Sequence, residues 1–226
     1  MKRTLFYPCS GRDIFESVRS WMHIIDDFWF AEMSFSGWRE FKSAEDMTEI
    51  PWRIPNVRVP GNLVSENETT LTGENDRIVP VRSATYHLEQ FNKSITLNFA
   101  GGCAVNAFHA LPVDRIAVFV NRGDHPVSGE GSSGICWLSD EGTTYFPEGM
   151  LQQVLSRMDV GGFIVTDGSN AVEALAPYWN RQNSAGSFPT DVHISIAPVT
   201  LHGVQLRCVG MLRPKYGPTL VWQNVG

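Results

Sequence analysis

The sequence lacks the residue patterns that hold metals or disulfides. Among 226 residues there are only four cysteines, none of them in a Cys-x-x-Cys pair, and the six histidines are scattered. Zinc sites and disulfide frameworks need closely spaced ligands, so we expect no metal site. Sparse, dispersed cysteines favour reduced thiols, and therefore a cytoplasmic protein.

Long apolar runs and clusters of basic residues are also missing. No segment approaches the roughly 18 consecutive apolar residues that a membrane-spanning helix needs, and the apolar stretch after Arg3 is too short for a signal peptide. The chain has 24 acidic against 18 basic residues, a net charge of −6, which disfavours a broad phosphate-binding surface. We expect no membrane association and no general nucleic-acid binding.

The chain does contain an ample apolar fraction and a regular alternation of segment types. Apolar residues make up 42% of it, enough for one domain with a hydrophobic core. Unbroken apolar runs predict buried strands at 4–7, 28–31, 116–120 and 163–166. Apolar residues at helical spacing predict helices at 11–22, 37–47, 101–110, 147–158 and 171–179. A Gly161-Gly162 pair is expected to separate the fourth of these helices from the strand that follows it.

The alternation predicts an α/β fold with an open, mostly parallel sheet and helices on both faces. Strand-like runs without helices between them predict an antiparallel C-terminal section at 193–199, 204–212 and 219–223. Two further runs, 84–90 and 94–99, predict a hairpin. The region at about 50–80 has the prolines and polar residues of a loop-rich or hairpin insertion. We expect it to lie within one domain of residues 1–226 and to offer a surface for a protein partner or a homo-oligomer.

The strongest candidate for a binding site is the turn at residues 7–13. It follows a short apolar strand and opens a helix, so its free backbone N–H groups point toward the strand tip. Arg12 would add positive charge for a carboxylate or phosphate. The alternative is a plain turn in which Ser10 caps the helix.

This turn resembles the first cofactor motif of class I S-adenosylmethionine-dependent methyltransferases. Residues 7–13 are similar to its Asp-Pro-Cys-Ala-Gly-Ser-Gly form, and 151–167 are similar to the helix, Gly-Gly pair and strand that follow the family's catalytic loop. The resemblance implies a Rossmann-like fold and S-adenosylmethionine as cofactor, with Glu32 accepting hydrogen bonds from the ribose. The cofactor-binding residues it implies are Tyr7, Pro8, Cys9, Ser10, Gly11, Arg12, Asp13, Glu32 and Asn121.

A glycine- and serine-rich segment, 123–134, is the second candidate. Asp124 and His125 there, with Asp167 at the next predicted strand tip, could act as acid or base near neutral pH. A surface loop with ordinary turn and capping residues is the alternative.

Together these features lead us to expect a small-molecule-binding protein, most plausibly an S-adenosylmethionine-dependent methyltransferase acting on an unknown acceptor. In the first motif, Tyr7 stands where the family has an acid and Asp13 where it has a glycine. These departures favour the alternative of a non-catalytic module that binds a ligand or a protein. A lyase acting on a nucleotide-like substrate is a third possibility.

Overall fold

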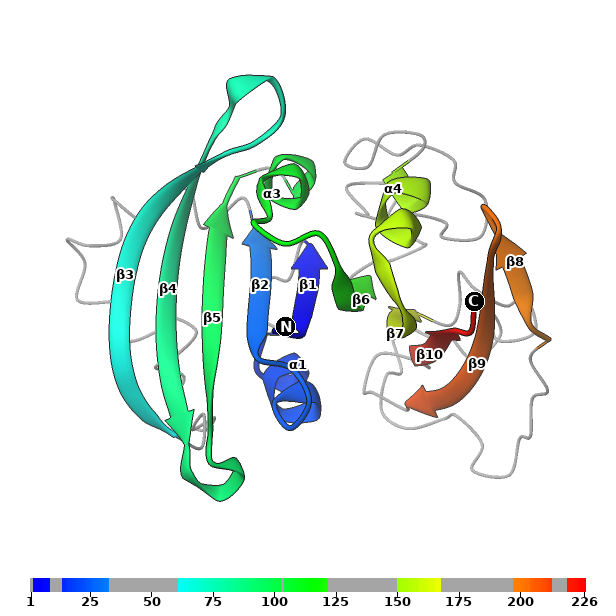
Figure 1. Ribbon diagram of the computed structural model, residues 1–226, viewed down its shortest axis with the longest axis horizontal. Helices are drawn as coiled ribbons and strands as arrows, with labels where there is room; N and C mark the ends of the chain where they lie inside the picture. The colour runs from blue at the N-terminus through cyan, green and yellow to red at the C-terminus, as the bar shows by residue number, and fades with distance from the viewer. Residues whose placement is uncertain are drawn as a thin grey trace, which may run out of the picture. The chain divides into compact units, whose positions relative to one another are not determined.

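The computed structural model describes residues 2–8, 14–32, 61–102, 104–121, 150–167, 197–212 and 219–226. The chain divides into two compact units, Met1–Asp114 and Arg115–Gly226, and Figure 1 shows the strands of each. Each unit is described by itself.

The first unit contains a mixed five-stranded sheet in the order β3-β4-β5-β2-β1. Its α-helices are α1 (Ile14–Trp21), which connects β1 to β2, and α3 (Ala104–Ala110), which follows β5. The strands are β1 (Thr4–Pro8), β2 (Asp27–Glu32), β3 (Asn62–Thr72), β4 (Ile78–Leu88) and β5 (Lys93–Gly101). β1, β2 and β5 run parallel, whereas β4 pairs antiparallel with both β3 and β5.

Aromatic side chains on one face of this sheet build its core. Phe28, Phe30 and Phe99 are all buried, and the Phe30 ring lies 6.3 Å from that of Phe28 and 5.7 Å from that of Phe99, centroid to centroid. The alternation of side chains along a strand places residues 28 and 30 on the same face. Tight turns join the antiparallel strands, with Asn75 and Asn92 in the left-handed conformation that asparagine tolerates better than most residues.

The second unit has a sheet in the order β6-β7-β10-β9-β8. β6 runs parallel to β7, and the remaining pairs are antiparallel. Helix α4 (Met150–Ser156) precedes β7. The strands are β6 (Ile116–Asn121), β7 (Met158–Asp167), β8 (Val199–Leu201), β9 (Val204–Leu212) and β10 (Thr219–Asn224).

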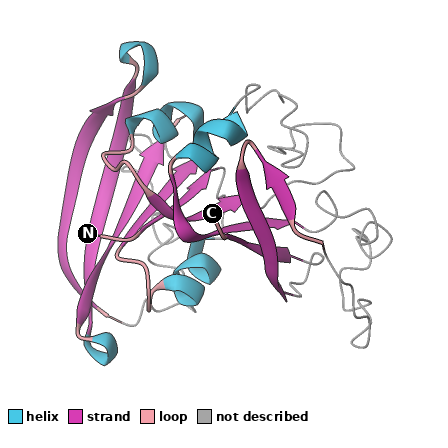
Figure 2. Ribbon diagram, turned by 45° about the vertical axis from the view of Figure 1, so that its right-hand side comes forward, coloured by secondary structure: helices cyan, strands magenta, loops and turns pink. Residues whose placement is uncertain are grey.

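The predicted α/β fold, with a mostly parallel Rossmann-like sheet and helices on both faces, is wrong. The described residues are mostly β, with 59% strand and 20% helix. Their helical parts are the short α-helices α1, α3 and α4 and two 3-10 turns, Glu74–Asp76 and Glu89–Phe91 (Figure 2). Among the strand pairs described within each unit, β1–β2, β2–β5 and β6–β7 are parallel. The error has a physical origin: apolar runs predict that strands exist, but pairing direction depends on long-range contacts that a local pattern does not contain.

Several individual elements were predicted correctly. The hairpin at 84–90 and 94–99 is confirmed as part of β4 and β5, and the antiparallel strands predicted at 204–212 and 219–223 are confirmed as β9 and β10. The strand predicted at 193–199 is not confirmed: residues 193–196 lie outside the described residues, and β8 begins only at Val199. Within the 50–80 region, residues from 62 onward form a hairpin of β3 with β4. The helices predicted at 37–47 and 171–179 lie outside the described residues.

The Gly161-Gly162 pair has a different role from the predicted one. It does not separate α4 from the next strand, because β7 begins at Met158 and contains both glycines. Ile116 pairs with Met158 but Val118 pairs with Phe163, so residues 159–162 form a bulge opposite Ala117. Gly161 has φ +83°, and a Cβ on Gly162 would lie 2.9 Å from the Asp159 carbonyl oxygen and 3.0 Å from that of Ala117.

We therefore predict that Gly162→Ala destabilises the protein by about 1–3 kcal/mol, because backbone atoms on two strands would have to move. Gly210→Ala is the matched control, since its Cβ would meet only Val221 Cβ at 3.9 Å, an ordinary contact. Urea denaturation of both variants measures the difference in the free energy of unfolding. Equal midpoints for the two variants would show that the bulge does not require glycine at residue 162.

Candidate binding site at the ends of the parallel strands

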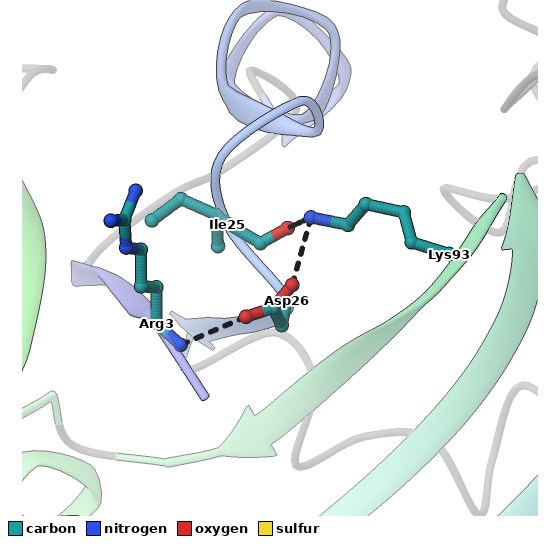
Figure 3. Close-up of polar contacts among 4 residues, drawn as sticks. All are labelled: Arg3, Ile25, Asp26 and Lys93. Atoms are coloured by element: carbon teal, nitrogen blue, oxygen red, sulfur yellow. Dashed lines mark hydrogen bonds and ion pairs between the residues drawn. The ribbon is translucent and has the colours of Figure 1, made fainter. Parts of the chain in front are cut away.

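A polar cluster ties together the amino ends of β1, β2 and β5 (Figure 3). The Asp26 carboxylate accepts a hydrogen bond from the backbone N–H of Arg3 at 3.0 Å and pairs with Lys93 Nζ at 2.8 Å. Lys93 Nζ also donates to the Ile25 carbonyl oxygen at 2.9 Å. One carboxylate and one ammonium group thus connect chain segments that are far apart in sequence.

The environment of Asp26 favours its ionised form. Partial burial by itself raises the pKa of this carboxyl group, but the hydrogen bonds from Lys93 and Arg3 and their positive charges outweigh burial, and the pKa is lowered from 3.8. The carboxylate is therefore charged near neutral pH, as its role in the cluster requires.

The parallel register brings the carboxyl ends of the same three strands to one edge of the sheet. Pro8 pairs with Ala31 and Glu32 pairs with Gly101, and the three arrowheads point the same way in Figure 1. Ligands of open sheets bind outside the carboxyl ends of parallel strands. This edge, formed by Pro8, Glu32 and Gly101 and called the carboxyl edge below, is the candidate binding site.

The turn after Gly101 adds an open stretch of backbone to the carboxyl edge. Gly102 has φ +112°, and a Cβ built on it would meet no heavy atom within 4 Å. Helix α3 begins two residues later and packs on β1 through Phe108, whose ring centroid lies 5.7 Å from that of Phe6. The sequence predicted this Gly-Gly pair at a helix start but did not assign it to the site. Its position directly after a predicted strand could have indicated a place in the site.

The structure places the predicted site residues in several environments. Tyr7 is buried, with 2% of its surface exposed, and its ring centroid lies 6.4 Å from that of Phe30, so it contributes to the core. Pro8 ends β1 and pairs with Ala31, and Glu32 ends β2 one residue further along the strand. The remaining residues of the turn, 9–13, lie outside the described residues.

Two other predicted residues lie in the second unit. Asn121 ends β6 and Asp167 ends β7, and Asn121 pairs with Thr166, so the register brings these strand ends together. Asp124 and His125 fall outside the part of the chain that the structure describes. In the described ranges, no group of three or more His, Cys, Asp or Glu residues could hold a metal ion.

Comparisons with protein-family models, curated proteins and solved structures found no match to this chain. No helix among the described residues is long and apolar enough to cross a membrane. The geometry of the chain itself is therefore the basis for a functional proposal.

The Asp26 cluster leads to a prediction about acid stability. Because the folded-state pKa is lowered, Asp26 stabilises the fold at pH values above the unfolded pKa, and this contribution is lost as pH falls through the folded pKa. We expect Asp26→Asn to cost about 1 kcal/mol at neutral pH, and the difference from wild type to shrink below pH 3.8. Urea denaturation across this pH range measures both quantities.

The exposed Asp114 provides the control. Asp114→Asn should leave the free energy of unfolding within about 0.5 kcal/mol of wild type at neutral pH. If Asp26→Asn and Asp114→Asn behave alike at every pH, the cluster does not stabilise the sheet.

Proposed function

We propose that the chain binds a small molecule at the carboxyl edge, with S-adenosylmethionine as the first ligand to test. The observation that carries this proposal is the parallel register that aligns Pro8, Glu32 and Gly101. Parallel sheet edges of this kind present turns and helix starts to a ligand rather than side chains alone.

Two features of the edge suit a nucleoside. An acidic residue at the end of a parallel strand is the usual partner of ribose hydroxyls in dinucleotide-binding sheets, and Glu32 ends β2. The open backbone at Gly102 would let a ligand approach closely, since no side chain shields that peptide.

Methyl transfer is a further step that depends on binding. Its support is the similarity of residues 7–13 and 151–167 to methyltransferase motifs, whereas the mostly β fold removes the support that a Rossmann-like sheet would have given. Transfer depends mainly on the alignment of donor and acceptor. A non-catalytic binding module is the second candidate, favoured by Tyr7, which packs in the core where the family has an acid.

The test is a calorimetric and thermal-shift titration of the whole chain with S-adenosylmethionine and S-adenosylhomocysteine. A ligand that binds only the folded state adds about 2.7 kcal/mol of stability at 100 times its Kd. We expect Glu32→Gln to weaken binding roughly tenfold, because charge-assisted hydrogen bonds to the ribose are lost. Glu89→Gln, in the exposed turn between β4 and β5, should leave binding unchanged.

The outcomes separate the candidates. Binding followed by release of S-adenosylhomocysteine in the presence of candidate acceptors supports methyl transfer, and binding without turnover supports the non-catalytic module. If neither compound binds, S-adenosylmethionine is withdrawn as ligand. If a panel of nucleotides fails as well, the carboxyl edge is not a nucleoside site.

A further inference from the structure

One face of the first sheet carries a ladder of short polar side chains. Three successive cross-strand pairs join β4 to β5 on this face. Their side chains are within hydrogen-bonding distance: Ser83 Oγ to Asn98 Oδ1 at 2.6 Å, Thr85 Oγ1 to Thr96 Oγ1 at 3.3 Å, and His87 Nδ1 to Ser94 Oγ at 3.4 Å. We call this the polar face.

The ladder lies on the opposite face of the sheet from Phe28 and Phe30, and its own face also carries the buried Phe6 and Trp29 in the row of Asn98. The intervening residues of β4 and β5, such as Ala84 and Leu97, point the other way and are buried. On β3 the polar face continues through the exposed Ser65, Asn67 and Thr69, which pair with Thr85, Ser83 and Val81. Cross-strand hydroxyl pairs of this kind stabilise a sheet, and they also present donors and acceptors to a ligand on that face.

Asp27 stands beside this ladder with its carboxylate held in a fixed orientation. One oxygen accepts a hydrogen bond from Asn98 Nδ2 at 2.8 Å, and the other accepts one from Trp29 Nε1, also at 2.8 Å. Asn98 is itself fixed, because it donates to the Phe28 carbonyl oxygen and accepts from Ser83. A carboxylate has about four lone-pair positions, so Asp27 retains capacity for further donors.

Thr4 provides a second, independent observation beside Asp27. It pairs directly with Asp27 in the parallel register of β1 and β2, on the same face. Only 1% of its surface is exposed, and its hydroxyl oxygen has no hydrogen-bond partner among the described residues. A buried hydroxyl without a partner is unfavourable, and such groups are rare in native structures.

We propose that the polar face binds a carbohydrate, with Asp27 and Thr4 contacting its hydroxyl groups. A sugar hydroxyl donates and accepts at once, so one such group can donate to the Asp27 carboxylate and pair with the Thr4 hydroxyl. An anionic ligand would be repelled by Asp27. An apolar ligand would leave the hydroxyls of the ladder buried without water, which is unfavourable.

The ladder is already ordered before a ligand binds, which lowers the conformational-entropy cost of binding. Side chains that already hydrogen bond to one another lose little conformational freedom when a ligand arrives. Asp27, Asn98 and Trp29 are linked in this way before any ligand is present.

The test is an amide-resolved NMR titration of the whole chain with glucose, galactose, mannose and N-acetylglucosamine, and then with oligosaccharides of any sugar that binds. We expect chemical-shift changes at Asp27, Thr85 and Thr96, with millimolar or tighter affinity. Tighter binding of oligosaccharides than of the monosaccharide would indicate that glycan chains are the source, whereas equal binding would indicate free sugars.

Two variants connect the binding to these side chains. Thr4→Val removes the hydroxyl at nearly constant volume, so we expect it to leave stability unchanged or higher while weakening binding roughly 2- to 10-fold. Asp27→Asn should weaken binding about tenfold or more. Thr70→Val, on the opposite face of exposed β3, is the matched control and should bind as wild type does.

The proposal is overturned if no sugar in the panel shifts the polar-face resonances. It is also overturned if sugars bind but Thr4→Val, Asp27→Asn and Thr70→Val all keep wild-type affinity. Because Thr4→Val removes only an unpartnered group, the result does not depend on whether Asp27→Asn folds.

Discussion

The Asp26 carboxylate is the polar contact that joins the amino ends of the three parallel strands of the first unit, which meet only in the folded chain. Arg3 before β1 and Lys93 at the start of β5 both bind it. Each hydrogen bond is modest in free energy, but together they fix which residue of one strand faces which residue of the next. The hydrophobic core excludes a one-residue slip but discriminates less against a two-residue slip, since that slip would place Phe30 where Phe28 lies.

Register matters here because each face of the sheet has its own packing and hydrogen-bond partners. A slip of one residue exchanges the side chains of a strand between faces. In β2 that exchange would bring Asp27 and Trp29 into the apolar core and turn Phe28 and Phe30 toward the ladder of Ser83, Thr85 and Asn98. It would also move Glu32 out of line with Gly101. A single register thus serves the core, the carboxyl edge and the polar face.

The features that sequence could predict were local ones. The apolar runs in β1 and β2 and the β4–β5 hairpin are visible in neighbouring residues, and Glu32 was found because it ends a recognisable strand. β3 was not predicted as a strand, because its side chains are polar and exposed nearly throughout. It forms a strand only through its pairing with β4. The contact between Asn98 and Asp27 joins residues 71 positions apart, and no pattern along the chain predicts it.

The carboxyl edge and the polar face share strands but cannot be one site for one small molecule. Asp27 begins β2 and Glu32 ends it, and a strand rises about 3.3 Å per residue, so their backbones are roughly 16 Å apart. Helix α3 also packs against the sheet between these ends, through the contact of Phe108 with Phe6 on the polar side. A nucleoside at Glu32 would leave Thr4 unpartnered, and a sugar at Asp27 would leave the edge open. The unpaired Thr4 hydroxyl therefore requires an explanation of its own, whatever binds at the carboxyl edge.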